Sequence, residues 1–201
     1  HKAIAIMQFK LEGQLIKEHP EFDLDKRLLL DKIDFENGTV NVEGTVYPLN
    51  DTFFPTIDPN NPYELTEDER AVMNSLSASI INSERLQTHI RYMFSHGALY
   101  KRINGNLLFH GCIPMDENGD FLPVDIYGAK CAGRALMDHL DKQIRASYFS
   151  PEKIKKYGKP GDLMWYLWLA KDSPLFGKEK MTTFERLFID DKASHKEHVR
   201  P

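Results

Sequence analysis

This sequence has only two cysteines, no long apolar stretch and no excess of basic residues. Cys112 and Cys131 cannot build the disulfide framework of a small secreted protein, so the cysteine content favours a reducing compartment, the cytoplasm. The 26 Lys and Arg residues are outnumbered by 30 Asp and Glu, and the formal charge of −4 gives no general attraction to nucleic acid or to an anionic membrane. No apolar run approaches the roughly 20 residues of a membrane-spanning helix. We therefore expect a soluble cytoplasmic protein with neither a nucleic-acid nor a membrane partner.

The chain is long enough to bury one hydrophobic core, since 41% of its 201 residues are hydrophobic. It begins at His1 and enters at once the apolar-periodic stretch "KAIAIMQFKLEGQLIKEH", and it ends in the polar stretch "DDKASHKEHVRP". We interpret residues 1–201 as a fragment of one larger domain, and we expect some functional residues to lie outside it.

Helices are predicted in several parts of the chain. Apolar residues recur at helical spacing from Ala3 to Ile16, and Pro20 ends this first segment. Asp23 can cap a second short helix through "LDKRLLLDK". Residues 132–148 carry apolar side chains on one helical face, and "DLMWYLWLA" is apolar almost all round, which predicts a buried helix.

A long helix is predicted in the middle of the chain. Thr66 and Glu69 have the spacing of a capping box, and the run "AVMNSLSASIINSERLQTHIRYMF" extends the helical pattern to about Phe94. His96 is then explained by the helix dipole, and Gly97 by a left-handed C-terminal cap. The polar and apolar residues of this helix would also suit contact with a second copy, so a homo-oligomer is one interpretation.

Turn signals predict several short antiparallel strands. Asn37-Gly38 and Glu43-Gly44 divide "KIDFENGTVNVEGTVYPL" into a small meander. Asn104-Gly105 joins "ALYKRI" to "NLLFHG" in a hairpin, and Asn118-Gly119 marks a further turn before "FLPVDIYG".

The pair His110-Gly111 follows the apolar residues "NLLF", which predict a buried strand. The imidazole therefore leaves a strand at the rim of a sheet, where binding sites are commonly built, and the glycine allows backbone or ligand to approach closely. Spacing alone leaves two interpretations open: a hydrogen-bonded structural histidine or a metal ligand.

The segments around His110 resemble a known family. "LLFHGCIP" is similar to the metallophosphoesterase segment in which a strand delivers a metal-binding histidine followed by glycine, with Cys112 where the Ser/Thr protein phosphatases have a second glycine. Three longer stretches resemble, in the same order, the bacterial class III fructose-1,6-bisphosphatases: "IAIMQFKLEGQLIKEHPEF", "NGNLLFHGCIPMDENG" and "MWYLWLAKDSPLFGKEKMTTFER". The resemblance extends over essentially the whole chain.

This resemblance implies an enzyme that hydrolyses the 1-phosphate of fructose 1,6-bisphosphate by a two-metal mechanism in gluconeogenesis. It implies manganese, with His110 as one metal ligand and the other ligands in flanking parts of a larger protein. It also implies a mixed α/β fold, in which strands around His110 belong to a metallophosphoesterase β-sandwich with added helices and a small meander. Residues 19–104 are then a family-specific insertion, and residues 105–201 part of the core of the catalytic domain.

Cationic residues near the C-terminus are candidates for binding a sugar phosphate. Lys178, Lys180 and Arg186 can make charge-assisted bonds to phosphate oxygens, and the apolar neighbours of Arg186 predict that it is partly enclosed. The lysines could equally form a solvated face with Glu179 and Glu185. Two alternatives stay open: a metallophosphatase for another substrate, or a catalytically silent segment that serves oligomerisation or regulation.

Overall fold

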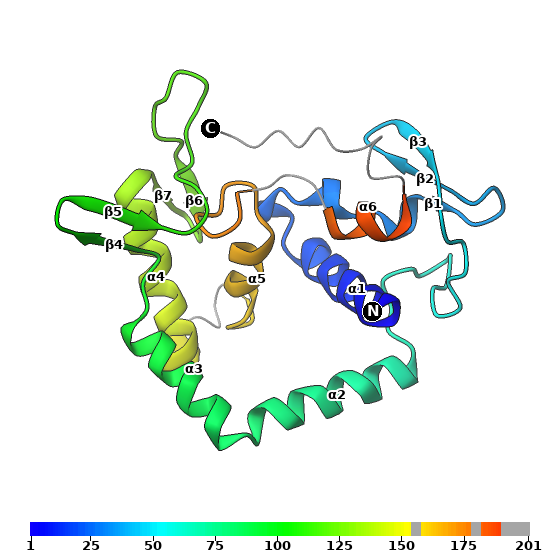
Figure 1. Cartoon of the computed structure of the whole chain (residues 1–201), viewed down its shortest axis with the longest axis horizontal. Helices are drawn as coiled ribbons and strands as arrows, with labels where there is room; N and C mark the ends of the chain where they lie inside the picture. The colour runs from blue at the N-terminus through cyan, green and yellow to red at the C-terminus, as the bar shows by residue number, and fades with distance from the viewer. Residues whose placement is uncertain (154–157, 178–181, 190–201) are drawn as a thin grey trace. The chain divides into compact units, whose positions relative to one another are not determined.

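The computed structural model describes residues 1–153, 158–177 and 182–189 (Figure 1). The chain divides into two compact units, the first made of residues 1–78 with 182–189 and the second of residues 79–153 with 158–177. Both units contain helices and small antiparallel sheets, so the predicted mixed α/β class is confirmed. Among the residues that the structure places, every helix is too short or too polar to cross a membrane.

The first unit combines helices with a three-stranded sheet. Its elements, in chain order, are α1 (Lys2–Glu18), η1 (Pro20–Phe22), η2 (Asp25–Arg27), η3 (Leu30–Lys32), β1 (Ile33–Asp34), β2 (Thr39–Val42), β3 (Thr45–Pro48), most of α2 (Glu67–Ile81) and α6 (Thr182–Phe188). Strand β2 pairs antiparallel with both β1 and β3, which confirms the predicted meander.

The predicted second helix after Asp23 is wrong. Asp23 adopts a left-handed conformation with φ 52°, and the chain continues as short 3₁₀ turns. These turns bury Leu24, Leu29 and Leu30, which are spread too widely around a helix to share one face. Burial of all three side chains therefore favours an irregular path over a single helix.

Helix α1 is buried on nearly every side. The Phe9 ring packs against Phe184 and Phe188 of α6, with ring centroids 5.7 and 6.5 Å apart. The predicted apolar face is only partly correct, because Ile4 is 54% exposed whereas Lys10 is fully buried. A buried lysine needs a partner of opposite charge.

The partner of Lys10 is Glu69, at the start of α2. The Lys10 Nζ atom lies 2.7 Å from the Glu69 carboxylate and also donates a hydrogen bond to the Thr56 carbonyl at 2.5 Å. The Thr66 amide donates to the same carboxylate at 2.9 Å, and the Glu69 amide donates to the Thr66 hydroxyl at 3.2 Å, which confirms the predicted capping box. Burial raises the pKa of Glu69, but the bonds from Lys10 and Thr66 outweigh it, so the pKa lies below its ordinary value. One carboxylate thus starts α2 and neutralises a lysine inside α1.

The predicted continuous helix from Thr66 to about Phe94 is wrong, because it consists of two helices. Helix α2 ends at Ile81, and α3 (Glu84–His96) begins after Ser83. The Ser83 hydroxyl accepts a hydrogen bond from the Leu86 amide at 3.4 Å, the bond of an N-cap. A serine that caps a new helix therefore interrupts the helical pattern.

The end of α3 is confirmed at His96, but the predicted left-handed cap at Gly97 is wrong. Gly97 has φ −68° and ψ 164°, an extended conformation, and its amide donates to the Met93 carbonyl at 2.7 Å. The carbonyls of Phe94 and Gly97 instead accept hydrogen bonds from the Arg145 guanidinium. A side chain from another helix thus takes over the capping that a left-handed glycine would provide.

The second unit contains the remaining helices and two hairpins. After α3 these are β4 (Tyr100–Ile103), β5 (Asn106–Phe109), β6 (Val124–Ile126), β7 (Ala129–Cys131), α4 (Gly133–Phe149), η4 (Pro151–Lys153) and α5 (Asp162–Leu169). Leu136, Leu140 and Ile144 of α4 are buried, as predicted. The prediction that the "DLMWYLWLA" helix is buried is confirmed for Leu163, Tyr166, Leu167 and Leu169 of α5. It is wrong for Trp168, which is 62% exposed.

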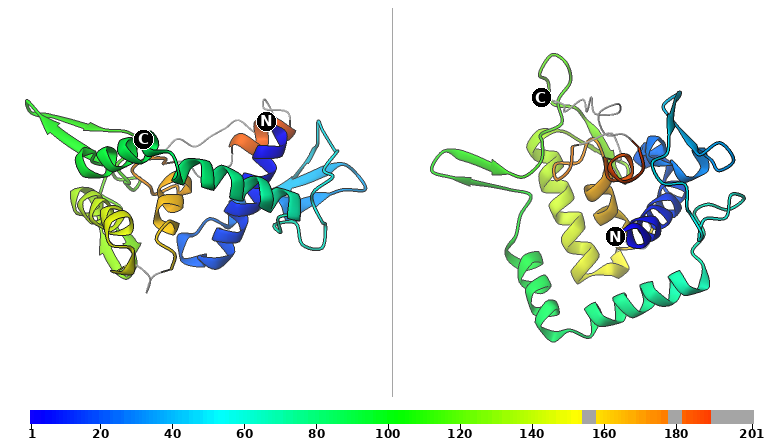
Figure 2. Two further views of the ribbon diagram at one scale, coloured as in Figure 1. Left: turned by 90° about the horizontal axis from the view of Figure 1, so that it is seen from below. Right: turned by 45° about the vertical axis from the view of Figure 1, so that its right-hand side comes forward.

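The hairpin β4–β5 extends away from α4 and α5 in each view (Figure 2). Its turn is the predicted Asn104-Gly105 pair, with φ 51° and 79°. The prediction that β5 is a buried strand is wrong for the described residues, since Leu107, Leu108 and Phe109 are 46%, 54% and 44% exposed. The described strands form sheets of three, two and two strands. The β-sandwich, like the division into residues 19–104 and 105–201, therefore stays a prediction about the complete protein.

Candidate functional site

The candidate site is the turn that leaves strand β5. Phe109 is the last residue of β5 and pairs with Tyr100 of β4, so His110 does emerge at a strand end, as predicted. The His110 side chain is exposed. Its imidazole is therefore accessible to a ligand.

The backbone after His110 is fixed by a loop distant in sequence. The amides of Gly111 and Cys112 both donate hydrogen bonds to the Pro174 carbonyl, at 2.9 and 3.1 Å. The Cys112 thiol donates to the Ser173 carbonyl at 3.4 Å. The two segments that carried much of the family resemblance are thus in direct contact, and they determine where the His110 backbone lies.

Glycine is required where these segments meet. A Cβ atom at position 111 would lie 2.5 Å from the Pro174 carbonyl oxygen, and one at position 177 would lie 2.6 Å from the Cys112 sulfur. Gly177 also has φ +65°, a conformation that favours glycine. The predicted close approach at Gly111 is therefore an approach of backbone to backbone.

The loop that receives this turn is itself well anchored. The Ser173 side chain is fully buried, and its hydroxyl donates to the Leu167 carbonyl at 2.6 Å and accepts from the Leu175 amide at 3.1 Å. Burial, reinforced by Asp172 and Cys112, raises the pKa of the nearby Tyr166 hydroxyl well above its ordinary value, so it stays protonated. The end of α5 and this loop thus form a fixed support for the His110 turn.

We expect Gly111→Ala to destabilise the complete protein by about 1–3 kcal/mol, because the added methyl group would displace the 173–175 backbone. The measurement is the midpoint of urea unfolding. Gly161→Ala is the matched control, since Gly161 has φ −81° and nothing lies within 4 Å of its added Cβ. This control should stay within about 0.5 kcal/mol of the wild type. Equal stability of the two variants would show that the contact at Gly111 is not tight.

The predicted phosphate-binding residues have different outcomes. Lys178 and Lys180 lie outside the described residues. Arg186 lies on α6, in the first unit, and its side chain is exposed, so the expected partial enclosure is wrong. Its apolar neighbours Phe184 and Phe188 are buried against α1 and do not enclose the guanidinium. A role of these cations in phosphate binding stays a prediction.

The described residues do not form a complete metal site. Within 1–153, 158–177 and 182–189, no three His, Cys, Asp or Glu side chains are grouped so that they could hold a metal ion. His110 can offer one imidazole from a fixed backbone, and its role as a metal ligand stays a prediction.

Two features near the candidate site are missing from the sequence predictions. The contact of Cys112 with Ser173 joins residues 61 positions apart, and no local sequence pattern predicts it. Arg102 and Arg134 line a pocket between the β4–β5 hairpin and the start of α4. The alternation of side chains along a strand could have predicted that Arg102 and Tyr100 share one face. The position of Arg134 next to them depends on the tertiary fold and could not be predicted from local sequence.

Comparisons with known proteins agree on one family. A family model described as Firmicute fructose-1,6-bisphosphatase matches residues 1–201. Class 3 fructose-1,6-bisphosphatases of Clostridium acetobutylicum and Clostridium tetani are each 55% identical to this chain, and that of Clostridium novyi is 51% identical. Each alignment covers 100% of this chain and 30% of the relative, so the chain spans less than a third of the length of these relatives. No solved structure gives a significant match.

Proposed function

We propose, since the chain belongs to the Firmicute fructose-1,6-bisphosphatase family, that the complete protein hydrolyses the 1-phosphate of fructose 1,6-bisphosphate. The observation that carries this proposal is identity of 55% over the full chain to class 3 fructose-1,6-bisphosphatases. The packing of the His110 turn on the Ser173 loop supports it, because two segments of the family resemblance meet there. The products would be fructose 6-phosphate and inorganic phosphate, and the place of the reaction would be gluconeogenesis in the cytoplasm.

His110 is proposed to be one ligand of a two-metal centre, with manganese as the metal and the other ligands in parts of the protein outside this chain. Bound manganese would supply positive charge for the phosphate oxygens and activation of the attacking water. The residues of this chain fix the backbone next to the imidazole, because the amides of Gly111 and Cys112 donate hydrogen bonds to the Pro174 carbonyl. An exposed imidazole on a fixed backbone suits ligation without a large rearrangement.

A second candidate function is favoured by one specific observation. Helix α2 has Glu69 as its buried residue, and Val72, Leu76 and Ile80 are 44%, 42% and 46% exposed. An exposed apolar stripe of this kind suits contact with another surface. The chain would then contribute oligomer contacts or regulation, and no catalytic group. A metallophosphatase for another substrate is the third possibility.

The proposal is tested by phosphate release from fructose 1,6-bisphosphate by the complete protein, with manganese and after removal of metal by a chelator. We expect release only in the manganese-loaded protein, with one phosphate released per substrate. Fructose 6-phosphate serves as the control substrate, and it should release no phosphate. Faster release from fructose 6-phosphate would favour a different phosphatase, and no release from either would favour the non-catalytic alternative.

A further inference from the structure

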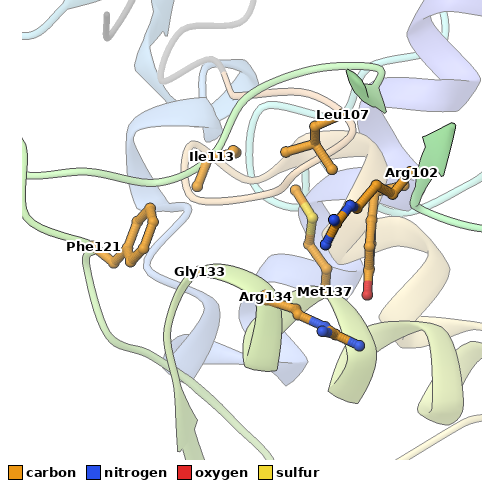
Figure 3. A pocket seen from close by; sticks show the side chains of 8 residues that line it. Arg102, Leu107, Ile113, Phe121, Gly133, Arg134 and Met137 are labelled. Atoms are coloured by element: carbon orange, nitrogen blue, oxygen red, sulfur yellow. The ribbon is translucent and has the colours of Figure 1, made fainter. Parts of the chain in front are cut away.

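A cavity of about 440 Å³ lies between the β4–β5 hairpin and the start of α4. Tyr100, Arg102 and Arg134 supply its polar side, and Leu107, Phe121 and Met137 most of its apolar wall. All of these residues belong to the second unit. Figure 3 shows the side chains of Arg102 and Arg134 on the same side of the pocket, with Phe121 on the opposite side.

The hairpin register places two polar residues in this pocket. Arg102 pairs with Leu107, and Tyr100 lies two residues before Arg102, so all three point to one face of the ladder. Lys101 pairs with Leu108 and points to the other face. Two cations adjacent in sequence are therefore separated by the sheet, and only Arg102 reaches the cavity.

The other arginine comes from the first turn of α4. Gly133 has φ +52°, and a Cβ there would lie 2.9 Å from the Phe121 ring, so glycine lets the Phe121 loop approach the helix start. Arg134 follows directly, and its guanidinium lies 3.3 Å from the Asp138 carboxylate. This carboxylate also accepts a hydrogen bond from the Tyr100 hydroxyl at 2.8 Å. Asp138 thus contacts both Arg134 and Tyr100 at the solvent-exposed edge of the cavity.

The pocket has an excess of positive charge, which favours binding of an anion. The carboxylate of Asp138 neutralises the charge of Arg134. In the described part of the chain, Arg102 has no carboxylate partner. Two arginines on one side of a cavity match the oxygens of a phosphate group, because each guanidinium can donate two parallel charge-assisted hydrogen bonds. The apolar wall suits the carbon skeleton of a small molecule, and the volume lies within the range of ligand sites.

We infer that this pocket binds the phosphate group of a small phosphorylated molecule. Two sources share this chemistry. One is the second phosphate of the bisphosphate substrate, a source that rests on the proposed function, and the other is a separate phosphorylated ligand that regulates the enzyme. The pocket uses Leu107 of the strand that leads to His110, so either ligand would contact the element that carries the proposed metal ligand.

The first experiment measures protection of individual arginines in the complete wild-type protein. Phenylglyoxal modifies exposed arginines, and mass spectrometry gives the modification rate at each position. With inorganic phosphate or fructose 6-phosphate as the probe, at about ten times its Kd, we expect the rates at Arg102 and Arg134 to fall about tenfold, because only the unliganded fraction of the protein reacts. Arg85 and Arg91 of α3, which are also exposed, should react at unchanged rates. No protection at Arg102 would overturn the proposal.

The second experiment separates the two sources with Arg102→Gln and the matched control Lys101→Gln, which removes the same charge from the opposite face of β4. If the ligand is the substrate, Arg102→Gln should raise KM for fructose 1,6-bisphosphate about tenfold at unchanged kcat, and Lys101→Gln should change neither. Protection of Arg102 with an unchanged KM would assign the pocket to a separate ligand. If the protein had no phosphatase activity, the proposed function would fail, whereas the protection measurement would still decide whether phosphate binds.

Discussion

Replacing His110 with alanine should lower the proposed manganese-dependent hydrolysis of fructose 1,6-bisphosphate by the complete protein by about a thousandfold or more. Loss of one ligand removes several kcal/mol of electrostatic stabilisation of the transition state, and each 1.36 kcal/mol corresponds to tenfold in rate. The exposed side chain of His110 makes no packing contribution comparable to a core residue, so thermal unfolding should stay close to that of the wild type. The measurements are kcat and the manganese content per chain.

The matched control for this variant is His96→Ala. His96 is also exposed and lies in the second unit, at the end of α3, where its imidazole contacts the Tyr92 carbonyl at 3.2 Å. It should retain activity and manganese. Wild-type turnover and manganese content in His110→Ala would remove His110 from the metal site and return it to a structural interpretation.

Replacing Lys10 with methionine should destabilise the first unit by about 3–5 kcal/mol, because it leaves the Glu69 carboxylate buried without its cation. The side chains of Lys10 and Glu69 are 0% and 9% exposed, so water has little access to replace the lost partner. Hydrogen exchange of the α1 amides in the complete protein measures this effect locally. Lys26→Met is the control, since Lys26 and Glu43 form an exposed pair at 3.1 Å whose loss should cost less than about 1 kcal/mol.

The pH dependence gives this prediction a second readout. The pKa of Glu69 is lowered in the folded protein, so the pair adds stability above the ordinary pKa of the carboxyl and loses it as the pH falls through the lowered pKa. Without Lys10, burial would raise this pKa, and the variant should be least destabilised at acidic pH. Lys10→Met/Glu69→Gln should recover much of the loss at neutral pH. A destabilisation under 1 kcal/mol with no pH dependence would show that the buried pair is not required.

The parts of the fold that the sequence predicted correctly depend on neighbouring residues. The Asn104-Gly105 turn and the Thr66–Glu69 capping box are set by residues at most three positions apart. The burial of Lys10 was not predicted, because its partner Glu69 lies 59 positions away. The exposure of Leu107 to Phe109 was missed for another reason: an apolar pattern predicts that a strand will be covered, but it does not say which part of the protein covers it.

At the candidate site, too, only the features that depend on neighbouring residues could be predicted from the sequence. A strand end followed by His110-Gly111 could be predicted from local pattern, and its functional meaning came from the family resemblance. Its support from the Pro174 carbonyl and the Ser173 loop depends on contacts about 60 positions apart in sequence. The pocket with Arg102 and Arg134 joins a hairpin to a helix start, so it could not be assembled before the tertiary fold was known.

The contact between Cys112 and Gly177 has an evolutionary consequence. A Cβ on residue 177 would lie 2.6 Å from the Cys112 sulfur, so the two positions share a space that admits one side chain. A glycine at position 112 would release that space, although the positive φ of residue 177 would still disfavour most side chains there. We therefore expect these positions to covary among relatives. A side chain larger than that of glycine should occur at position 177 only where position 112 carries a side chain smaller than that of cysteine.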